Sequence, residues 1–264
     1  MNDSRRRLAL SSVAVVVAVF TSFPLHAQLG SSENARQIVD EWERRTTSAS
    51  YRYEGLLRTF EDGGKTSQKR WVLERLGAHG QSKVVIRFTE PAEVKGVELL
   101  IVNHPDRSSD QWMWTPAIER DRRIALQDRS TRFFGTDFTF EDLEERDVDQ
   151  DDYELLGEQT INFAPTWKIA ATPKQSKTSQ YTKSILFIRK DNYAMARIDF
   201  FVKDQQVRRL TYADIRNVQG IWTAHDLTMS DLKRYSRTEL VLDKVQYNLP
   251  LDESRFTLQG LRRP

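Results

Sequence analysis

The sequence predicts a mainly β protein built on an antiparallel sheet, with one N-terminal amphipathic helix. Short segments in which apolar and polar residues alternate recur along most of the chain, and turn residues separate them. One stretch near the N-terminus instead has the 3.6-residue apolar spacing of a surface helix. The chain contains no cysteine, so its apolar core must hold it together without disulfides.

The first 27 residues have the pattern of a cleavable signal peptide. Three arginines at positions 5–7 are followed by an apolar run over 8–23, and Ala27 is the small residue at the cleavage site. An uncleaved membrane anchor is the alternative. A spanning helix needs ~20 apolar residues, however, and this run is shorter and contains Ser and Thr. We therefore expect export to the periplasm, with residues 28–264 forming a single domain.

The excess positive charge of the chain resides in that N-terminal segment. The whole sequence has 40 Lys and Arg against 38 Asp and Glu, and residues 1–27 hold three of the arginines and one aspartate. The remaining chain is therefore electrically neutral, which argues against nucleic-acid binding, because such domains usually carry a basic excess. With no cysteine at the cleavage site, we also expect no lipid anchor on the processed protein.

Residues 32–46 are predicted to form the helix. Ala35, Ile38, Val39 and Trp42 share one face at spacings of three and four residues, so this face should be covered. We expect Trp42 to pack against the sheet.

The predicted strands flank a less regular middle. Residues 116–152 are highly charged and weakly periodic, as is typical of functional or disordered segments, and a short helix is expected near 140–145. Alternation elsewhere indicates about ten or eleven strands, each with one apolar face. The segments with strand signals are 51–57, 68–76, 83–89, 97–103, 111–115, 153–161, 166–172, 181–190, 194–203, 206–218, 222–232 and 238–247.

The sequence lacks recognisable catalytic or metal-binding motifs. His79, His104 and His225 have no metal-ligand spacing, and no nucleophile elbow or phosphate loop is present. A triad assembled by the fold alone stays open. Asp147, Asp149, Asp151 and Glu158 match some positions of a calcium loop, but the required glycine is replaced by an aspartate. We expect a solvated acidic loop, no metal, no cofactor and no enzymatic activity.

Residues 111–143 carry the most specific pattern in the chain, an aromatic strand with a proline, a basic element and an aromatic Gly-Thr-Asp signature. In order, these are Trp112, Trp114 and Pro116, then Arg120, Arg122, Arg123 and Ile124, then Phe133, Gly135, Thr136, Asp137, Phe138, Phe140, Glu141, Asp142 and Leu143. This pattern resembles the LolA-like outer-membrane lipoprotein-sorting family, in particular its branch associated with transporters of the resistance-nodulation-division (RND) type. Phe134 stands where many relatives have Met.

The resemblance implies a LolA/LolB-like fold, an unclosed antiparallel β-barrel with a helical lid over an apolar cavity. It implies a periplasmic carrier that shields the acyl chains of lipoproteins or lipids between the inner and outer membranes. The implied partners are the acylated cargo, an inner-membrane transporter of the ABC or RND type, and a membrane surface in transient contact. We expect a monomer. The alternative is an accessory subunit of an RND-type transporter that binds no lipid.

Site residues follow from the strand pattern together with the resemblance. We expect the cavity wall to include Trp71, Phe88, Leu99, Ile101, Trp112, Trp114, Ile185, Phe187, Ile198 and Phe200, although for any single one of them an ordinary core position is favoured. We assign the lid or rim to Arg122, Arg123, Phe133, Phe134, Gly135, Asp137 and Phe138. The two arginines can meet acidic head groups or a transporter, but pairing with the acidic run 141–154 is favoured. Asp137 is expected to cap a turn or the short helix.

Overall fold

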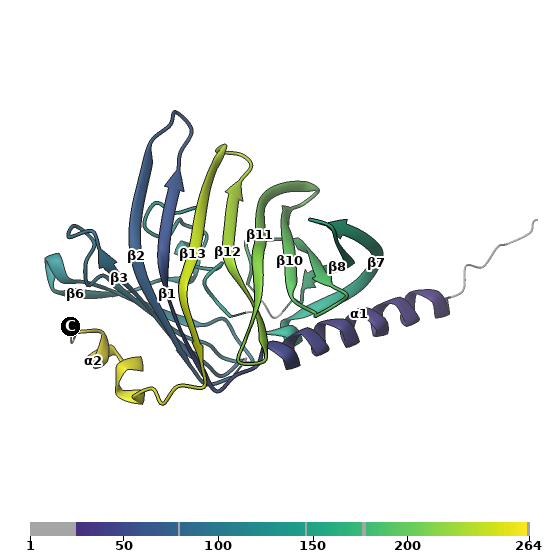
Figure 1. Cartoon of the computed structure of the whole chain (residues 1–264), viewed down its shortest axis with the longest axis horizontal. Coiled ribbons are helices and arrows are strands. Elements are labelled where there is room, and N and C mark those ends of the chain that lie inside the picture. The colour runs from purple at the N-terminus through teal and green to yellow at the C-terminus, as the bar shows by residue number, and fades with distance from the viewer. Residues whose placement is uncertain (1–24, 79, 146, 176–177, 263–264) are drawn as a thin grey trace, which may run out of the picture.

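The computed structural model describes residues 25–262 apart from 79, 146, 176 and 177, with side chains from residue 34 onward. Residues 1–24 of the predicted signal peptide lie outside this range, so the structure does not test that prediction. A single 13-stranded sheet dominates the fold, and it curves strongly around its concave face (Figure 1). No helix among the described residues is both long and apolar enough to cross a membrane.

The sheet is preceded by helix α1 (Leu25–Thr46) and followed by the short helix α2 (Leu258–Leu261). Four single-turn 3₁₀ helices lie at Pro116–Ile118, Leu126–Asp128, Val148–Gln150 and Glu253–Phe256. The strands are β1 (Ser50–Phe60), β2 (Thr66–Leu76), β3 (Lys83–Glu90), β4 (Glu98–Val102), β5 (Asp110–Thr115), β6 (Arg120–Arg123), β7 (Asp151–Ile161), β8 (Ala164–Pro173), β9 (Lys183–Arg189), β10 (Met195–Val202), β11 (Gln205–Val218), β12 (Ile221–Asp231) and β13 (Ser236–Tyr247).

The strands form two meanders joined by pairing of the first strand with the last. The order is β6-β5-β4-β3-β2-β1-β13-β12-β11-β10-β9-β8-β7, and every neighbouring pair is antiparallel. β6 and β7 are the two edges of the described sheet and do not pair with each other, so the barrel is not closed. The predicted mainly β, unclosed architecture is confirmed. The strand count exceeds the prediction, partly because the charged segment Arg120–Arg123 pairs with β5 despite having no apolar alternation.

Helix α1 covers part of the concave face with its predicted apolar stripe. Ala35 and Val39 are fully buried, and Ile38 and Trp42 are half-buried against the same core. This core belongs to the β7–β13 half of the sheet and contains Ile169, Leu186 and Ile198 among others. The predicted packing of Trp42 on the sheet is therefore confirmed.

Residues 124–143, which we call the plug, fill the concave face of the other half. Phe133 and Phe140 are buried in one cluster with Phe88, Leu99 and Ile101 of the sheet. Rings stack within it: the centroids of Phe88 and Phe133 lie 5.5 Å apart. Part of the irregular segment predicted over residues 116–152 thus packs into the apolar core of this half of the sheet.

The short helix predicted near residues 140–145 is absent from the described structure. The chain makes successive turns there, because the Asp142 carboxylate accepts hydrogen bonds from the Thr139 amide and hydroxyl, both at 2.8 Å. Such local side-chain bonds compete with helical ones. The prediction was wrong for this reason.

Another apolar cluster lies on the opposite, convex face of the sheet, under the C-terminal segment. Phe256 and Leu261 are buried against Val85 and Leu100, with Trp112 and Trp114 packed at the margin. β4 is therefore buried on both faces, which explains its continuous apolar sequence Leu99-Leu100-Ile101.

Because Phe88 joins the sheet to the plug, replacing it should destabilise the whole fold. Phe88→Ala removes a side chain that is 1% exposed and leaves a cavity beside Phe133. We expect a loss of about 3–5 kcal/mol in the free energy of unfolding, measured by urea denaturation. Ile118→Ala, at a side chain that is 63% exposed, is the control and should change stability by less than about 0.5 kcal/mol. Similar losses for both variants would contradict the described core.

Candidate functional site

A cavity of about 410 Å³ lies on the concave face, beyond the half that the plug fills. Its walls come mainly from β1, β2 and β10–β13. Its cover comes from the end of α1, from the last residues of the plug (Glu141 and Asp142) and from Glu144, Glu145, Gln150 and Asp151. Pockets that bind small molecules have volumes of roughly 300–1,000 Å³, so this cavity can hold a ligand.

The floor of the cavity is apolar. The side chains that form it include Ile198, Phe200, Leu210, Leu227, Met229 and Leu240. They come from the central strands, where alternate residues point to the concave face. A hydrocarbon chain placed there would contact apolar side chains from four neighbouring strands.

The cover carries carboxylates, and three of them are paired with arginines. Glu145 is 2.5 Å from Arg75, and Asp142 is 3.3 Å from Arg208. Glu144 pairs with Arg129 of the plug. The first two pairs join the cover to the sheet and the third joins it to the plug, and each places opposite charges together where water is scarce.

A tyrosine cluster closes one end of the cavity. The hydroxyls of Tyr53 and Tyr247 lie 2.8 Å apart, and Tyr247 is 2.6 Å from the hydroxyl of Thr223. Tyr51 stacks on Tyr53, and the guanidinium of Arg75 lies 4.5 Å from the Tyr51 ring centroid. Burial, reinforced by the negative charge of Glu145, raises the pKa of Tyr51 well above its usual value. These hydroxyls are therefore uncharged at neutral pH.

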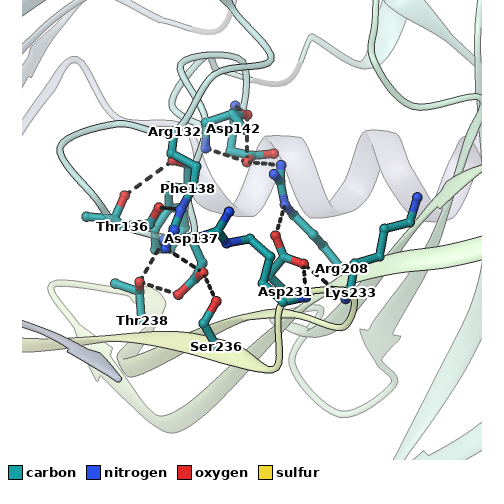
Figure 2. Close-up of polar contacts among 12 residues, drawn as sticks. Arg132, Thr136, Asp137, Phe138, Asp142, Arg208, Asp231, Lys233, Ser236 and Thr238 are labelled. Carbon is teal, nitrogen blue, oxygen red and sulfur yellow. Dashed lines mark hydrogen bonds and ion pairs between the residues drawn. The ribbon is translucent and has the colours of Figure 1, made fainter. Parts of the chain in front are cut away.

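The plug is attached to β13 by a buried carboxylate, shown in Figure 2. Asp137 is fully buried and accepts hydrogen bonds from Ser236 at 2.5 Å and Thr238 at 2.8 Å. Its backbone amide donates to the Thr238 hydroxyl at 2.8 Å, and Arg132 supplies the counter-charge at 2.9 Å. Asp137 thus has a structural role, as expected, but it binds a strand about a hundred residues away instead of capping a local turn.

The predicted wall residues fall into three groups. Trp71, Ile198 and Phe200 line the cavity. Phe88, Leu99 and Ile101 lie on the concave face, but the plug covers them. Trp112, Trp114, Ile185 and Phe187 belong to other clusters and do not line the cavity.

Four predicted wall residues lie on the convex side because the other alternate set of side chains on their strand faces the cavity side. On β9, Leu186 and Ile188 face the concave core, whereas Ile185 and Phe187 point the other way. Every residue from 184 to 188 is buried, so the sequence does not reveal which alternate set faces inward. On β5 the two tryptophans face the convex core, because the C-terminal segment provides a second apolar surface there.

The predicted pairing of Arg122 and Arg123 with the acidic run was wrong. Arg123 binds Asp110 at 2.5 Å, and Arg122 is exposed on the edge strand β6. Three carboxylates of the run instead pair with the buried or nearly buried arginines described above. The arginines and the acidic run 141–154 are close in sequence, but the fold places the arginines on β6 at the edge of the sheet, where Arg123 meets Asp110.

The aromatic signature forms the interior of the plug and does not form a rim. Phe133 and Phe138 are buried, and Phe134 is half-buried with its ring centroid 5.4 Å from that of Phe88. Phe134 and Gly135 both have positive φ, 46° and 75°, which makes the sharp turn that returns the chain into the core. The glycine is required at this turn because an L side chain is strained there.

The acidic segment 147–158 is not a free solvated loop. Asp147 and Asp151 are buried, and Asp147 accepts a hydrogen bond from the Asp149 amide at 2.8 Å. Asp149 pairs with Arg36 of α1 at 2.7 Å. Across the described residues no group of three or more His, Cys, Asp or Glu side chains is placed to hold a metal ion.

The histidines do not reach the cavity in the part of the chain that is described. His104 is 3.0 Å from Asp110 in a surface loop, and His225 is buried with its ring 3.2 Å from the Thr223 carbonyl. His79 lies outside the described residues. Neither His104 nor His225 is among the cavity-lining residues.

If Asp137 holds the plug, removing its charge should loosen that segment. Asp137→Asn leaves Arg132 without a counter-charge and weakens the bonds to Ser236 and Thr238. We expect a loss of about 2–4 kcal/mol in the free energy of unfolding. The matched control is Asp121→Asn at an exposed pair with Arg262, which should cost less than about 1 kcal/mol. Equal losses for the two variants in urea denaturation would contradict the proposed attachment.

Comparisons with known proteins agree with this architecture. A family model with the description "Uncharacterized protein" matches residues 80–263, which is more than half of the chain. No curated protein matches at a significant level. A domain described as an outer membrane lipoprotein-sorting protein from Vibrio parahaemolyticus has a TM-score of 0.83 at 24% identity, covering 88% of this chain and 100% of that one.

Two further solved structures are similar. A DUF1329 family protein from Desulfovibrio piger has a TM-score of 0.83 at 24% identity, with 88% and 99% of the two chains covered. A LolA superfamily protein from Nitrosomonas europaea has a TM-score of 0.68 at 19% identity, with 85% and 98% covered. The resemblance seen in the sequence is confirmed at the level of the fold. The chain therefore belongs to the family whose model matches residues 80–263, and it has the fold of the LolA superfamily.

Proposed function

We propose that the protein is a periplasmic carrier that shields acyl chains of lipoproteins or lipids during transfer from the inner to the outer membrane. The observation that carries this proposal is the cavity of about 410 Å³ with an apolar floor. The fold shared with a lipoprotein-sorting domain and with a LolA superfamily protein supports it. The proposed activity is binding and release, without bond chemistry.

The energetics suit a carrier. Each methylene removed from water contributes about 0.8 kcal/mol, so a chain of ten or more carbons gains several kcal/mol on entering an apolar cavity. Release then requires a membrane, a transporter or a second carrier that offers equal shielding. We propose an inner-membrane transporter of the ABC or RND type as the donor, and transient contact with a membrane surface at either end of the path.

The alternative, an accessory subunit of an RND-type transporter that binds no lipid, predicts a filled interior. The plug does fill one half of the concave face, but the other half retains the cavity. The unfilled half favours the carrier.

Native mass spectrometry of protein purified from the periplasm separates the two functions. A carrier is expected to retain an acylated species whose mass is lost after delipidation. It should also take up the fluorescent probe N-phenyl-1-naphthylamine into the emptied cavity. An accessory subunit would show the bare mass of the chain and no probe uptake, and that result would overturn the carrier proposal.

Filling the cavity should abolish binding while the fold persists. Leu227→Trp adds a large side chain to the floor between β11 and β13. We expect the affinity for N-phenyl-1-naphthylamine to fall about tenfold or more, with a stability loss of about 1–3 kcal/mol from overpacking. The control Leu258→Trp lies on the exposed surface of α2 and should leave binding unchanged. Unchanged binding in the folded Leu227→Trp protein would contradict the assignment of the site.

A further inference from the structure

The turn between β12 and β13 presents four exposed side chains in a row, Leu232, Lys233, Arg234 and Tyr235. Tyr235 is 81% exposed and Leu232 is 38% exposed. Lys233 and Arg234 form no ion pair with another described residue. The turn therefore combines two uncompensated positive charges with two large hydrophobic groups.

Hydrogen bonds hold the backbone of this turn in place. The Oδ1 atom of the buried Asp231 accepts hydrogen bonds from the backbone amides of Lys233 and Arg234, both at 3.0 Å (Figure 2). The Leu232 amide donates to the Val207 carbonyl of β11 at 3.0 Å. Because the turn is already ordered, its side chains can bind a partner without a large loss of backbone entropy.

Folding does not account for the tyrosine at the end of the turn. Tyr235 has a φ of 53°, in the left-handed region that glycine and asparagine adopt at lower cost. Its side chain is mostly exposed, so it adds little buried apolar area to the fold. A residue that is unfavourable for the backbone and contributes little to the core points to a contact outside the chain.

The chemistry of the turn matches the interfacial region of a lipid bilayer. Tyrosine is enriched at the level of the head groups, and a leucine side chain gains free energy when it reaches the acyl boundary. Lysine and arginine near a membrane surface are attracted by anionic head groups. A stable protein interface needs roughly 20–30 residues a side, far more than this turn offers. A membrane is therefore the partner that the turn fits.

Phe163, in the turn between β7 and β8, provides an internal comparison, because it is 100% exposed. Its neighbours Asn162 and Ala164 carry no charge. Successive turns of an antiparallel meander alternate between the two ends of the sheet, so this turn lies at the opposite end from the β12–β13 turn. An exposed aromatic ring is present at both ends, and the adjacent pair of cations distinguishes the β12–β13 turn from the β7–β8 turn.

We propose that the β12–β13 turn is a docking element for bilayers that contain anionic phospholipids. Leu232 and Tyr235 enter the interfacial region, and Lys233 and Arg234 bind the negatively charged head groups. The inference rests on the proposed carrier function, which requires a membrane contact but leaves its place on the molecule and the class of lipid open.

Vesicle sedimentation tests the class of lipid. We expect the purified protein to bind vesicles of phosphatidylglycerol and phosphatidylcholine in equal parts at least ~10-fold more tightly than vesicles of phosphatidylcholine alone. The preference should shrink as the salt concentration rises, because salt screens exposed charges. Equal binding to both vesicles would overturn the inference.

Probe uptake keeps the two proposals apart. The same sample is tested for uptake of N-phenyl-1-naphthylamine into the cavity. Normal uptake without any vesicle binding would overturn the docking element and leave the carrier function standing. Vesicle binding without uptake would overturn the carrier function instead.

Paired variants separate the two parts of the turn. Lys233→Gln with Arg234→Gln should remove the preference for phosphatidylglycerol and its salt dependence. Leu232→Ser with Tyr235→Asn should weaken binding to the anionic vesicles about tenfold or more while the salt dependence remains, and asparagine suits the positive φ. The control Phe163→Ser should bind as the unaltered protein does. Equal weakening by the control, or unaltered binding by either tip variant, would overturn the assignment.

A fluorescent label locates the contact directly. The chain contains no cysteine, so Leu232→Cys or Phe163→Cys provides a single site for the environment-sensitive dye NBD. We expect the emission of the dye at position 232 to rise and shift to the blue on saturation with anionic vesicles, and the emission at position 163 to stay unchanged. Unchanged emission at position 232, or an equal change at both positions, would overturn the role of the β12–β13 turn.

Discussion

The sheet does not close, and its concave face is apolar. Thirteen strands curve around a face too large for their own side chains to fill, so other segments must cover it. The plug covers one half with stacked phenylalanines, and α1 covers part of the other with a stripe centred on Val39. The remaining space is the cavity. The covering segments and the cavity are thus two outcomes of the same excess of apolar surface.

Buried polar contacts fix the plug to the sheet. Asp137 joins the plug to β13 through two hydroxyls and an arginine, and Asp142 joins it to Tyr181 and Arg208. Charges in such places contribute less to net stability than to a unique arrangement, because their desolvation offsets much of their attraction. By contrast, the ion pair that joins Arg36 of α1 to Asp149 is exposed and therefore weak.

The sequence was sufficient for the fold class and insufficient for the details of the site. Alternation predicted an antiparallel sheet, and the resemblance carried by the aromatic signature implied that this sheet does not close. The spacing of Ala35 and Val39 predicted the covered helix face. The sequence does not show which alternate residues of β9 face the concave side, because residues on both faces of that strand are buried. The tyrosine cluster was missed because Tyr247 meets Tyr53 only when the last strand pairs with the first. The partner of Asp137 was missed for a similar reason, since Thr238 is a hundred residues away.

The concave face is divided into a half that the plug fills and a half that holds the cavity, and photochemical labelling can locate a ligand on it. An acyl ester carrying a diazirine near the chain end can be bound, irradiated and mapped by mass spectrometry. We expect labels on peptides that contain cavity residues such as Leu227, Met229 and Leu240, and none on Phe88, Leu99 or Ile101 beneath the plug. Labels on the residues beneath the plug would contradict it, because they would show that the plug moves aside and the whole concave face receives the ligand.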